Sequence, residues 1–140
     1  MKPITLPEVE YLSSRLSMEY LGFKESIPAF KTRFPYVLES CLAVPFQKFH
    51  KKDLYQGLIG KAAILFYLMI KNHPFQNGNK RIALTTLLVF LYKNNKWIKI
   101  DNQELYNFII WVTSSPGDFK DEVVMSIEKF LKSHLVTTLI

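Results

Sequence analysis

The residues best suited to chemistry lie in one short segment, His73-Pro74-Phe75-Gln76-Asn77-Gly78-Asn79-Lys80-Arg81. A histidine side chain can accept a proton near neutral pH. Lys80 and Arg81 add two positive charges a few residues further along, and Gly78 allows the backbone to come close to a bound group. A histidine beside a cationic, glycine-containing loop suits the removal of a proton from a hydroxyl next to a bound phosphate.

Two apolar stretches flank this segment and predict the helices that position it. Asp53 is a candidate N-cap for a long helix that ends near Lys71, and residues Ala62–Ile70 are apolar almost all round. A helix of that kind usually lies at the centre of its domain. A second apolar helix is predicted from about Asn79 to Asn94. Its N-terminus would bring backbone N–H groups and the positive end of the helix dipole to the segment, which favours an anion there.

The rest of the chain also predicts helices. A capping box, Thr5-Leu6-Pro7-Glu8, opens a first helix with one apolar stripe, and Gly22 ends it. A short helix or turn is predicted over Pro35–Val44, and further helices are predicted from Asp101 to Val112 and from Ser115-Pro116 to about His134. The apolar stripe of the first helix consists of Val9, Leu12, Leu16 and Tyr20. The fold class is therefore all-α, with at most one small β-hairpin.

Length and composition narrow the possible classes of protein. A chain of 140 residues with 49% hydrophobic residues predicts a single domain, 1–140, with its own core. The net charge of +6 favours an anionic ligand or an acidic partner. We expect no nucleic-acid partner, because no nucleic-acid motif accompanies the basic residues. A single cysteine, Cys41, excludes an intramolecular disulfide framework and a multi-cysteine metal site. The apolar runs are too short for a membrane span, so we expect no membrane association and a cytoplasmic location.

The segment from His73 to Arg81 resembles the signature of the Fic/Doc family, His-Pro-Phe-x-Asp/Glu-Gly-Asn-Gly/Lys-Arg. Each fixed position matches except one, where Asn77 replaces the acidic residue. Upstream, Leu38–Pro45 is similar to a segment of Doc-like proteins that lies by the active-site flap. The similarity spans about Tyr36 to Asn95. It implies the all-α Fic fold, a helical bundle whose central helix pair flanks the motif loop, with a β-hairpin as the flap.

The resemblance also implies roles for individual residues. His73 would be the general base that activates a hydroxyl of a target protein. The phosphates of ATP would be held by four residues, Gly78, Asn79, Lys80 and Arg81, of which Arg81 would also neutralise charge during the reaction. Phe75 would point into the core and anchor the loop. Glu39 and Ser40, in the segment near the flap, would dock the target by strand pairing.

Asn77 stands where the family binds Mg²⁺ through a carboxylate. A neutral amide oxygen is a much weaker ligand for this hard cation. Three possibilities remain open from the sequence. Lys80 could supply part of the missing positive charge in a slow enzyme, or the domain could bind a nucleotide or phosphorylated ligand without turnover. Alternatively, the deamidation-prone pair Asn77-Gly78 could convert partly to aspartate.

Lys80 and Leu84 separate two branches of the family. AMP-transferring Fic enzymes usually carry glycine at the first position and a second arginine at the other. The residues found here resemble the Doc branch, whose toxins transfer the terminal phosphate of ATP to elongation factor Tu. The sequence thus favours a protein kinase over an AMP transferase. It also lacks the self-inhibitory Ser/Thr-x-x-x-Glu-Gly/Asn motif, which suggests regulation by a separate antitoxin, as in bacterial toxin–antitoxin pairs.

Overall fold

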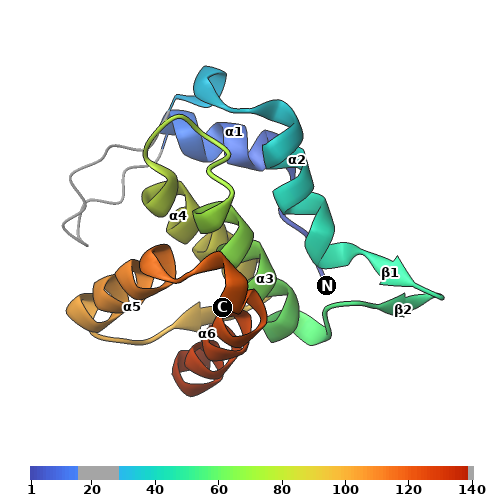
Figure 1. The fold of residues 1–140 in the computed structure, drawn as a ribbon, viewed down its shortest axis with the longest axis vertical. Helices are drawn as coiled ribbons and strands as arrows, with labels where there is room; N and C mark the ends of the chain where they lie inside the picture. The colour runs from blue at the N-terminus through green and yellow to red at the C-terminus, as the bar shows by residue number, and fades with distance from the viewer. Residues whose placement is uncertain (16–28, 139–140) are drawn as a thin grey trace.

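The computed structural model describes residues 1–15 and 29–138, and these are mostly helical (Figure 1). The predicted contributions of Leu16, Tyr20 and Gly22 lie outside the described residues. The α-helices are α1 (Leu6–Arg15), α2 (Pro35–Ala43), α3 (Gly57–Lys71), α4 (Asn79–Lys93), α5 (Asn102–Ser114) and α6 (Lys120–His134). Short 3₁₀ turns are η1 (Phe30–Thr32), η2 (Val44–Phe46) and η3 (Gly117–Phe119). The predicted all-α fold class is confirmed.

Helices α3 and α4 form the centre of the molecule. Every residue of α3 from Gly60 to Ile70 is buried, as is every residue of α4 from Arg81 to Leu88. This agrees with a sequence that is apolar almost all round, because such a helix needs neighbours on every side. α3 packs against α4 and α6, and α1 covers α4. In the part of the chain that the structure describes, no helix is both long and apolar enough to cross a membrane.

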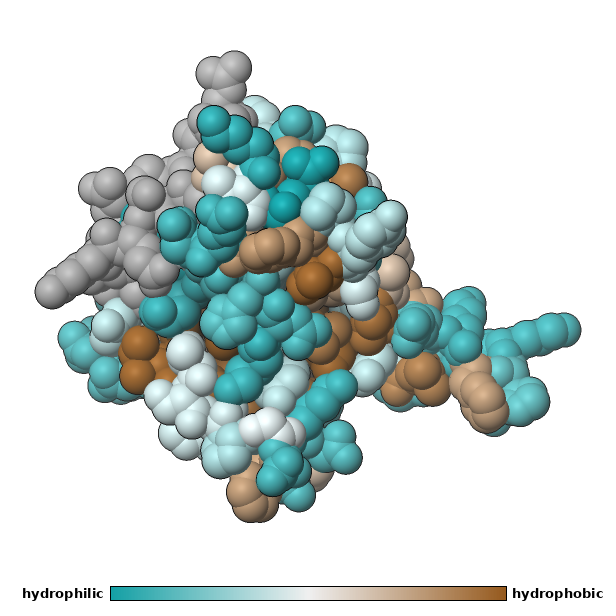
Figure 2. Space-filling view, turned by 45° about the horizontal axis from the view of Figure 1, so that its top comes forward, coloured by the Kyte–Doolittle hydropathy of each residue, from teal (hydrophilic) through white to brown (hydrophobic). Residues whose placement is uncertain are grey.

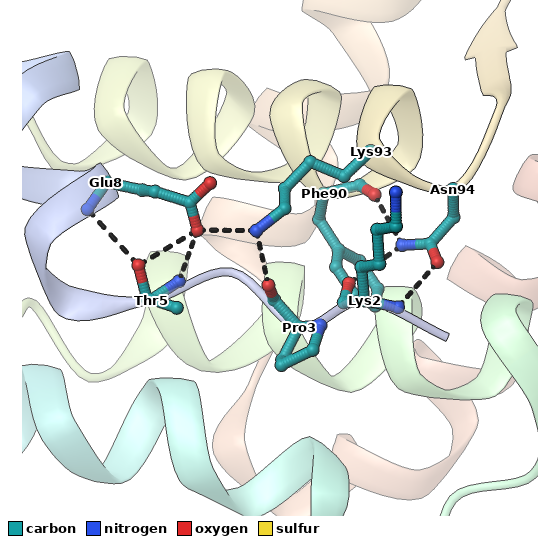
Figure 3. Close-up of polar contacts among 7 residues, drawn as sticks. All are labelled: Lys2, Pro3, Thr5, Glu8, Phe90, Lys93 and Asn94. Atoms are coloured by element: carbon teal, nitrogen blue, oxygen red, sulfur yellow. Dashed lines mark hydrogen bonds and ion pairs between the residues drawn. The ribbon is translucent and has the colours of Figure 1, made fainter.

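The predicted capping box at the start of α1 is present, and it is extended by a contact to α4 (Figure 3). The backbone N–H of Thr5 donates to Glu8 Oε1 at 2.8 Å, and the N–H of Glu8 donates to Thr5 Oγ1 at 3.4 Å. Lys93 Nζ lies 2.6 Å from the same Glu8 oxygen. Asn94 then holds the backbone of Lys2 through both ends of its side-chain amide. These contacts fasten the N-terminal segment to the end of α4.

Two small antiparallel sheets are present in the described chain, where the sequence predicted at most one hairpin. Strands β1 (Lys48–Phe49) and β2 (Lys52–Asp53) form a hairpin. Strands β3 (Lys96–Ile98) and β4 (Leu135–Thr137) form the second sheet. Strand β3 precedes α5 and strand β4 follows α6. Because the two strands are far apart in the sequence, no turn motif predicts their pairing. The described chain thus contains the one hairpin that the sequence allowed, together with a second, non-local pairing that the sequence did not predict.

The start of α3 also differs from the prediction. The helix begins at Gly57 with Gln56 at the N-cap position, and Asp53 lies in strand β2. Asp53 instead accepts a hydrogen bond from Lys61 Nζ at 3.0 Å. A carboxylate placed before an apolar helix resembles a cap in the sequence, but here it serves as the partner of a buried lysine.

Candidate active site

The motif loop connects the end of α3 to the start of α4, and His73 opens it. The backbone of His73 has φ 48°, in the left-handed region that few residues other than glycine adopt. Its side chain is exposed, whereas the next two residues, Pro74 and Phe75, are buried. Left-handed backbone at a non-glycine residue persists only where neighbouring structure imposes it, and such positions cluster at active sites. The loop therefore holds the backbone of His73 in place and leaves its imidazole exposed to solvent.

Phe75 anchors this loop in the core, as predicted. Its side chain is 1% exposed. Its backbone N–H donates to Asn79 Oδ1 at 2.9 Å, and its carbonyl accepts from Asn79 Nδ2 at 2.8 Å. Both ends of the Asn79 amide are thus used to hold the loop. The sequence assigned Asn79 to phosphate; this geometry leaves its backbone N–H, rather than its side chain, as the group for that role.

Gly78 is the N-cap of α4 and has φ 71° and ψ 17°. Glycine adopts this left-handed conformation without the steric cost that a Cβ imposes. The carbonyl of Gly78 already accepts the first helical hydrogen bond, from the N–H of Ile82 at 3.0 Å. The sharp turn at Gly78 therefore brings the positive end of the α4 dipole directly against the motif loop. This arrangement suits an anion, as the sequence predicted.

The cationic residues lie in the first turn of α4. Arg81 is only 2% exposed, and Lys80 is half-buried. Arginine is rarely buried to this degree, because removing its charge from water is costly. A guanidinium held inside the fold at a helix N-terminus gives a fixed positive charge. Asn77, by contrast, is exposed in the loop.

A hollow of about 420 Å³ lies beside the loop, between α2 and the end of α3. Tyr36, Val37 and Ser40 line it from α2, and Asn72, the residue before His73, lines it from the other side. The structure thus brings Ser40 to the neighbourhood of the motif. Sequence reasoning missed Asn72, although its polar side chain directly precedes the histidine.

The predicted docking mode of Glu39 and Ser40 is corrected by the structure. Both residues are exposed, but they lie in the middle of helix α2. The backbone N–H and C=O groups in the middle of a helix are hydrogen-bonded within that helix, so neither residue can pair with a target strand. A role in target contact through their side chains stays a prediction.

The β1–β2 hairpin is not a flap over this loop. It joins the N-terminal end of α3, whereas His73 follows the C-terminal end. At 1.5 Å per residue, the 15 residues of α3 separate the two by about 22 Å. In Figure 1 the hairpin projects away from the helices.

The segment that packs on the loop instead is Arg33–Phe34. Arg33 forms an antiparallel bridge with Phe75, and the N–H of Phe34 donates to the Pro74 carbonyl at 2.8 Å. The sequence indicates extended backbone at this segment, because Phe34 precedes Pro35 and a residue before proline favours the extended conformation. Extended backbone is what a bridge of this kind requires.

The sequence model of the Fic/DOC family matches residues 3–91, which is more than half of the chain. The chain belongs to the Fic/DOC family. Neither a curated protein nor a solved structure gives a significant match. The matched range runs from α1 through α4 and includes the whole motif loop. Fic/DOC membership indicates a transferase that acts on a hydroxyl of a protein.

The loop fits the phosphates of a nucleotide better than it fits a resident metal ion. Gly78, the N-terminus of α4 and the charges of Lys80 and Arg81 all favour an anion. A Mg²⁺ site prefers carboxylate oxygens, and the loop offers the amide of Asn77 in their place. Among the described residues, no group of three or more His, Cys, Asp or Glu side chains could hold a metal.

Proposed function

We propose that this Fic/DOC protein is a kinase of the Doc type, which transfers the terminal phosphate of ATP to a hydroxyl of elongation factor Tu. The preference for phosphate transfer over AMP transfer rests on two positions. Lys80 stands where AMP-transferring relatives carry glycine. Leu84 stands where they carry a second arginine, and its side chain is fully buried in the core. The second position therefore adds no charge that could hold further phosphates.

In the proposed reaction, His73 takes the proton of the target hydroxyl. The hydroxyl oxygen then forms a bond to the terminal phosphorus, and the bond from that phosphorus to the bridging oxygen of ADP breaks. Arg81, Lys80 and the N-terminus of α4 stabilise the negative charge, which is the main requirement of phosphoryl transfer. The observation that carries this proposal is the left-handed His73, held beside an anion-favouring helix end and a hollow lined by Ser40 and Asn72.

Asn77 favours a second candidate, a domain that binds a nucleotide or phosphorylated ligand without turnover. The replaced carboxylate would lower the affinity for Mg²⁺, and with it the rate. Under this candidate the protein would act by sequestering its partner, and a growth defect on expression would survive His73→Ala. A separate antitoxin would regulate the protein under either candidate.

The test is transfer of label from ATP to purified elongation factor Tu, with Mg²⁺ present. Transfer from γ-labelled ATP that disappears in His73→Ala and persists in His50→Ala supports the kinase. His50 is the matched control, because it is an exposed histidine that also has positive φ and lies in the β1–β2 turn, away from the motif loop. Label from the α-phosphate would establish AMP transfer instead. Nucleotide binding without transfer by wild type or Asn77→Asp would favour the binding domain.

A further inference from the structure

The β1–β2 hairpin projects as a narrow element from the helical body (Figures 1 and 2). Lys48, Lys51 and Lys52 are all exposed on it. Phe49 lies among them with 64% of its side chain exposed, and its ring meets that of His50 edge to face at 4.2 Å. Three lysines and an uncovered aromatic ring on so small an element form a surface that the motif loop, at the other end of α3, does not use.

The base of the hairpin is fixed by a buried lysine. Lys61 is 4% exposed in α3, and its Nζ donates to Asp53 Oδ2 and to the Tyr55 carbonyl. Residues 48–53 contain one carboxylate, Asp53, and its Oδ2 lies 3.0 Å from Lys61 Nζ. It therefore directs its charge toward Lys61, and the positive charge of the hairpin tip is not neutralised within the hairpin.

The turn of the hairpin is built from residues that do not suit its conformation. His50 has φ 50° and Lys51 has φ 66°, so both central residues are left-handed. Two-residue turns of this kind favour Asn-Gly, because other side chains resist positive φ. A His-Lys turn is less stable than that alternative. Strained backbone of this kind clusters at functional sites.

We propose that this hairpin enters the major groove of duplex DNA. Two paired strands lie about 4.8 Å apart. Each arm of the hairpin, from Lys48 to His50 and from Lys51 to Asp53, has three residues and reaches about 10 Å at ~3.4 Å per residue. The major groove of DNA is about 12 Å wide and 8.5 Å deep, and it admits a two-stranded ribbon. Lys48 and Lys52 on the two strands and Lys51 in the turn meet the phosphates of the groove walls, and Phe49, which directly precedes the turn, meets the base edges. A convex, cationic element is complementary in shape and charge to a concave, anionic groove of this size.

This proposal differs from the sequence-based expectation of no nucleic-acid partner. That expectation rested on the absence of a known motif, and residue types alone do not show that the lysines lie on a projecting ribbon. The proposal is independent of the transferase function, because the hairpin and His73 lie at opposite ends of α3. Duplex RNA is the main competitor, but its major groove is too narrow and deep to admit a ribbon.

The probe is a fluorescein-labelled DNA duplex of 20 base pairs, with binding followed by anisotropy between 50 and 200 mM NaCl. Three phosphate contacts predict a fall in affinity of about 40-fold over this range, from a slope near −0.9 per contact. We expect Lys48→Ala/Lys51→Ala/Lys52→Ala to abolish this binding. The matched control, Lys99→Ala/Lys129→Ala/Lys132→Ala, removes the same charge from exposed helix and strand-end positions and should retain the binding.

A second variant separates binding from folding. His50→Asn/Lys51→Gly gives the turn its preferred residues, so the melting temperature should rise while DNA affinity falls. With two lysines left, the salt effect should shrink to about 12-fold. His73→Ala should bind DNA as wild type does. Equal loss in the control triple, equal affinity for duplex RNA of the same length, or tighter binding to poly-glutamate than to DNA would each overturn the proposal.

Discussion

Asn79→Ala tests whether one buried amide holds the motif loop in shape. The substitution removes the two hydrogen bonds to the backbone of Phe75, at 2.9 and 2.8 Å. Each such bond contributes about 1 kcal/mol net, and a buried backbone group left without its partner costs about 1–3 kcal/mol. Because Asn79 is 7% exposed, water replaces these bonds poorly. We therefore expect the free energy of unfolding to fall by about 3 kcal/mol.

Urea unfolding measures this loss, and amide hydrogen exchange of Phe75 locates it. The N–H of Phe75 should be protected in the wild type and should exchange faster in Asn79→Ala. The control is Asn77→Ala, which removes an exposed amide from the same loop and should change stability by less than about 0.5 kcal/mol. If Asn79→Ala is as stable as that control, or if exchange at Phe75 is unchanged, the reasoning that assigns the amide to the loop is refuted.

Three further perturbations probe the surrounding structure. Partial burial pushes the pKa of Glu8 upward, but its hydrogen bonds, chiefly from Lys93, outweigh this and leave the pKa below its usual value. The stabilisation is therefore present above the unfolded pKa and is lost as pH falls through the folded pKa. In urea titrations, Glu8→Gln should cost stability at pH 6, and this cost should shrink as the pH is lowered through the folded pKa. Burial raises the pKa of Cys41 to about 12, so a disulfide reagent should modify this thiol at pH 8 only at the rate of unfolding. Asp53→Asn leaves Lys61 buried with a weaker partner and should cost about 1–2 kcal/mol by thermal melts, whereas Lys61→Met keeps the packing and should cost less.

The sequence predicted the features that depend on local pattern. The continuous apolar faces of α3 and α4 required burial on all sides, and the structure places both helices in the centre. The break at Gly78 fixed where α4 begins, because glycine there allows the left-handed turn that the N-cap adopts. The Fic/Doc resemblance rested on the same loop, and the family match confirms it. The Doc-like branch and the roles of the site residues stay predictions.

The features that were missed depend on contacts between distant residues. Whether the Asn79 amide faces a ligand or the Phe75 backbone is decided by the path of the loop, which residue types alone do not give. Asp53 has the spacing of a helix cap, yet it accepts a hydrogen bond from the buried Lys61, about one turn into α3. Strands β3 and β4 pair across two intervening helices, where no turn signal applies. The placement of the hairpin at the far end of α3 likewise follows from helix direction rather than from composition.

The structure separates the residues that shape the loop from the residue that departs from the family pattern. Phe75, Gly78 and Asn79 hold the loop by burial, a left-handed turn and paired hydrogen bonds, whereas Asn77 is exposed. Restoring the carboxylate with Asn77→Asp should therefore leave the free energy of unfolding within about 0.5 kcal/mol of wild type. It should also raise label transfer from ATP and make the rate depend on the Mg²⁺ concentration, because a carboxylate is the ligand that this cation prefers. A variant that folds as well as wild type but gains neither Mg²⁺ dependence nor transfer would show that Asn77 is not what limits the reaction.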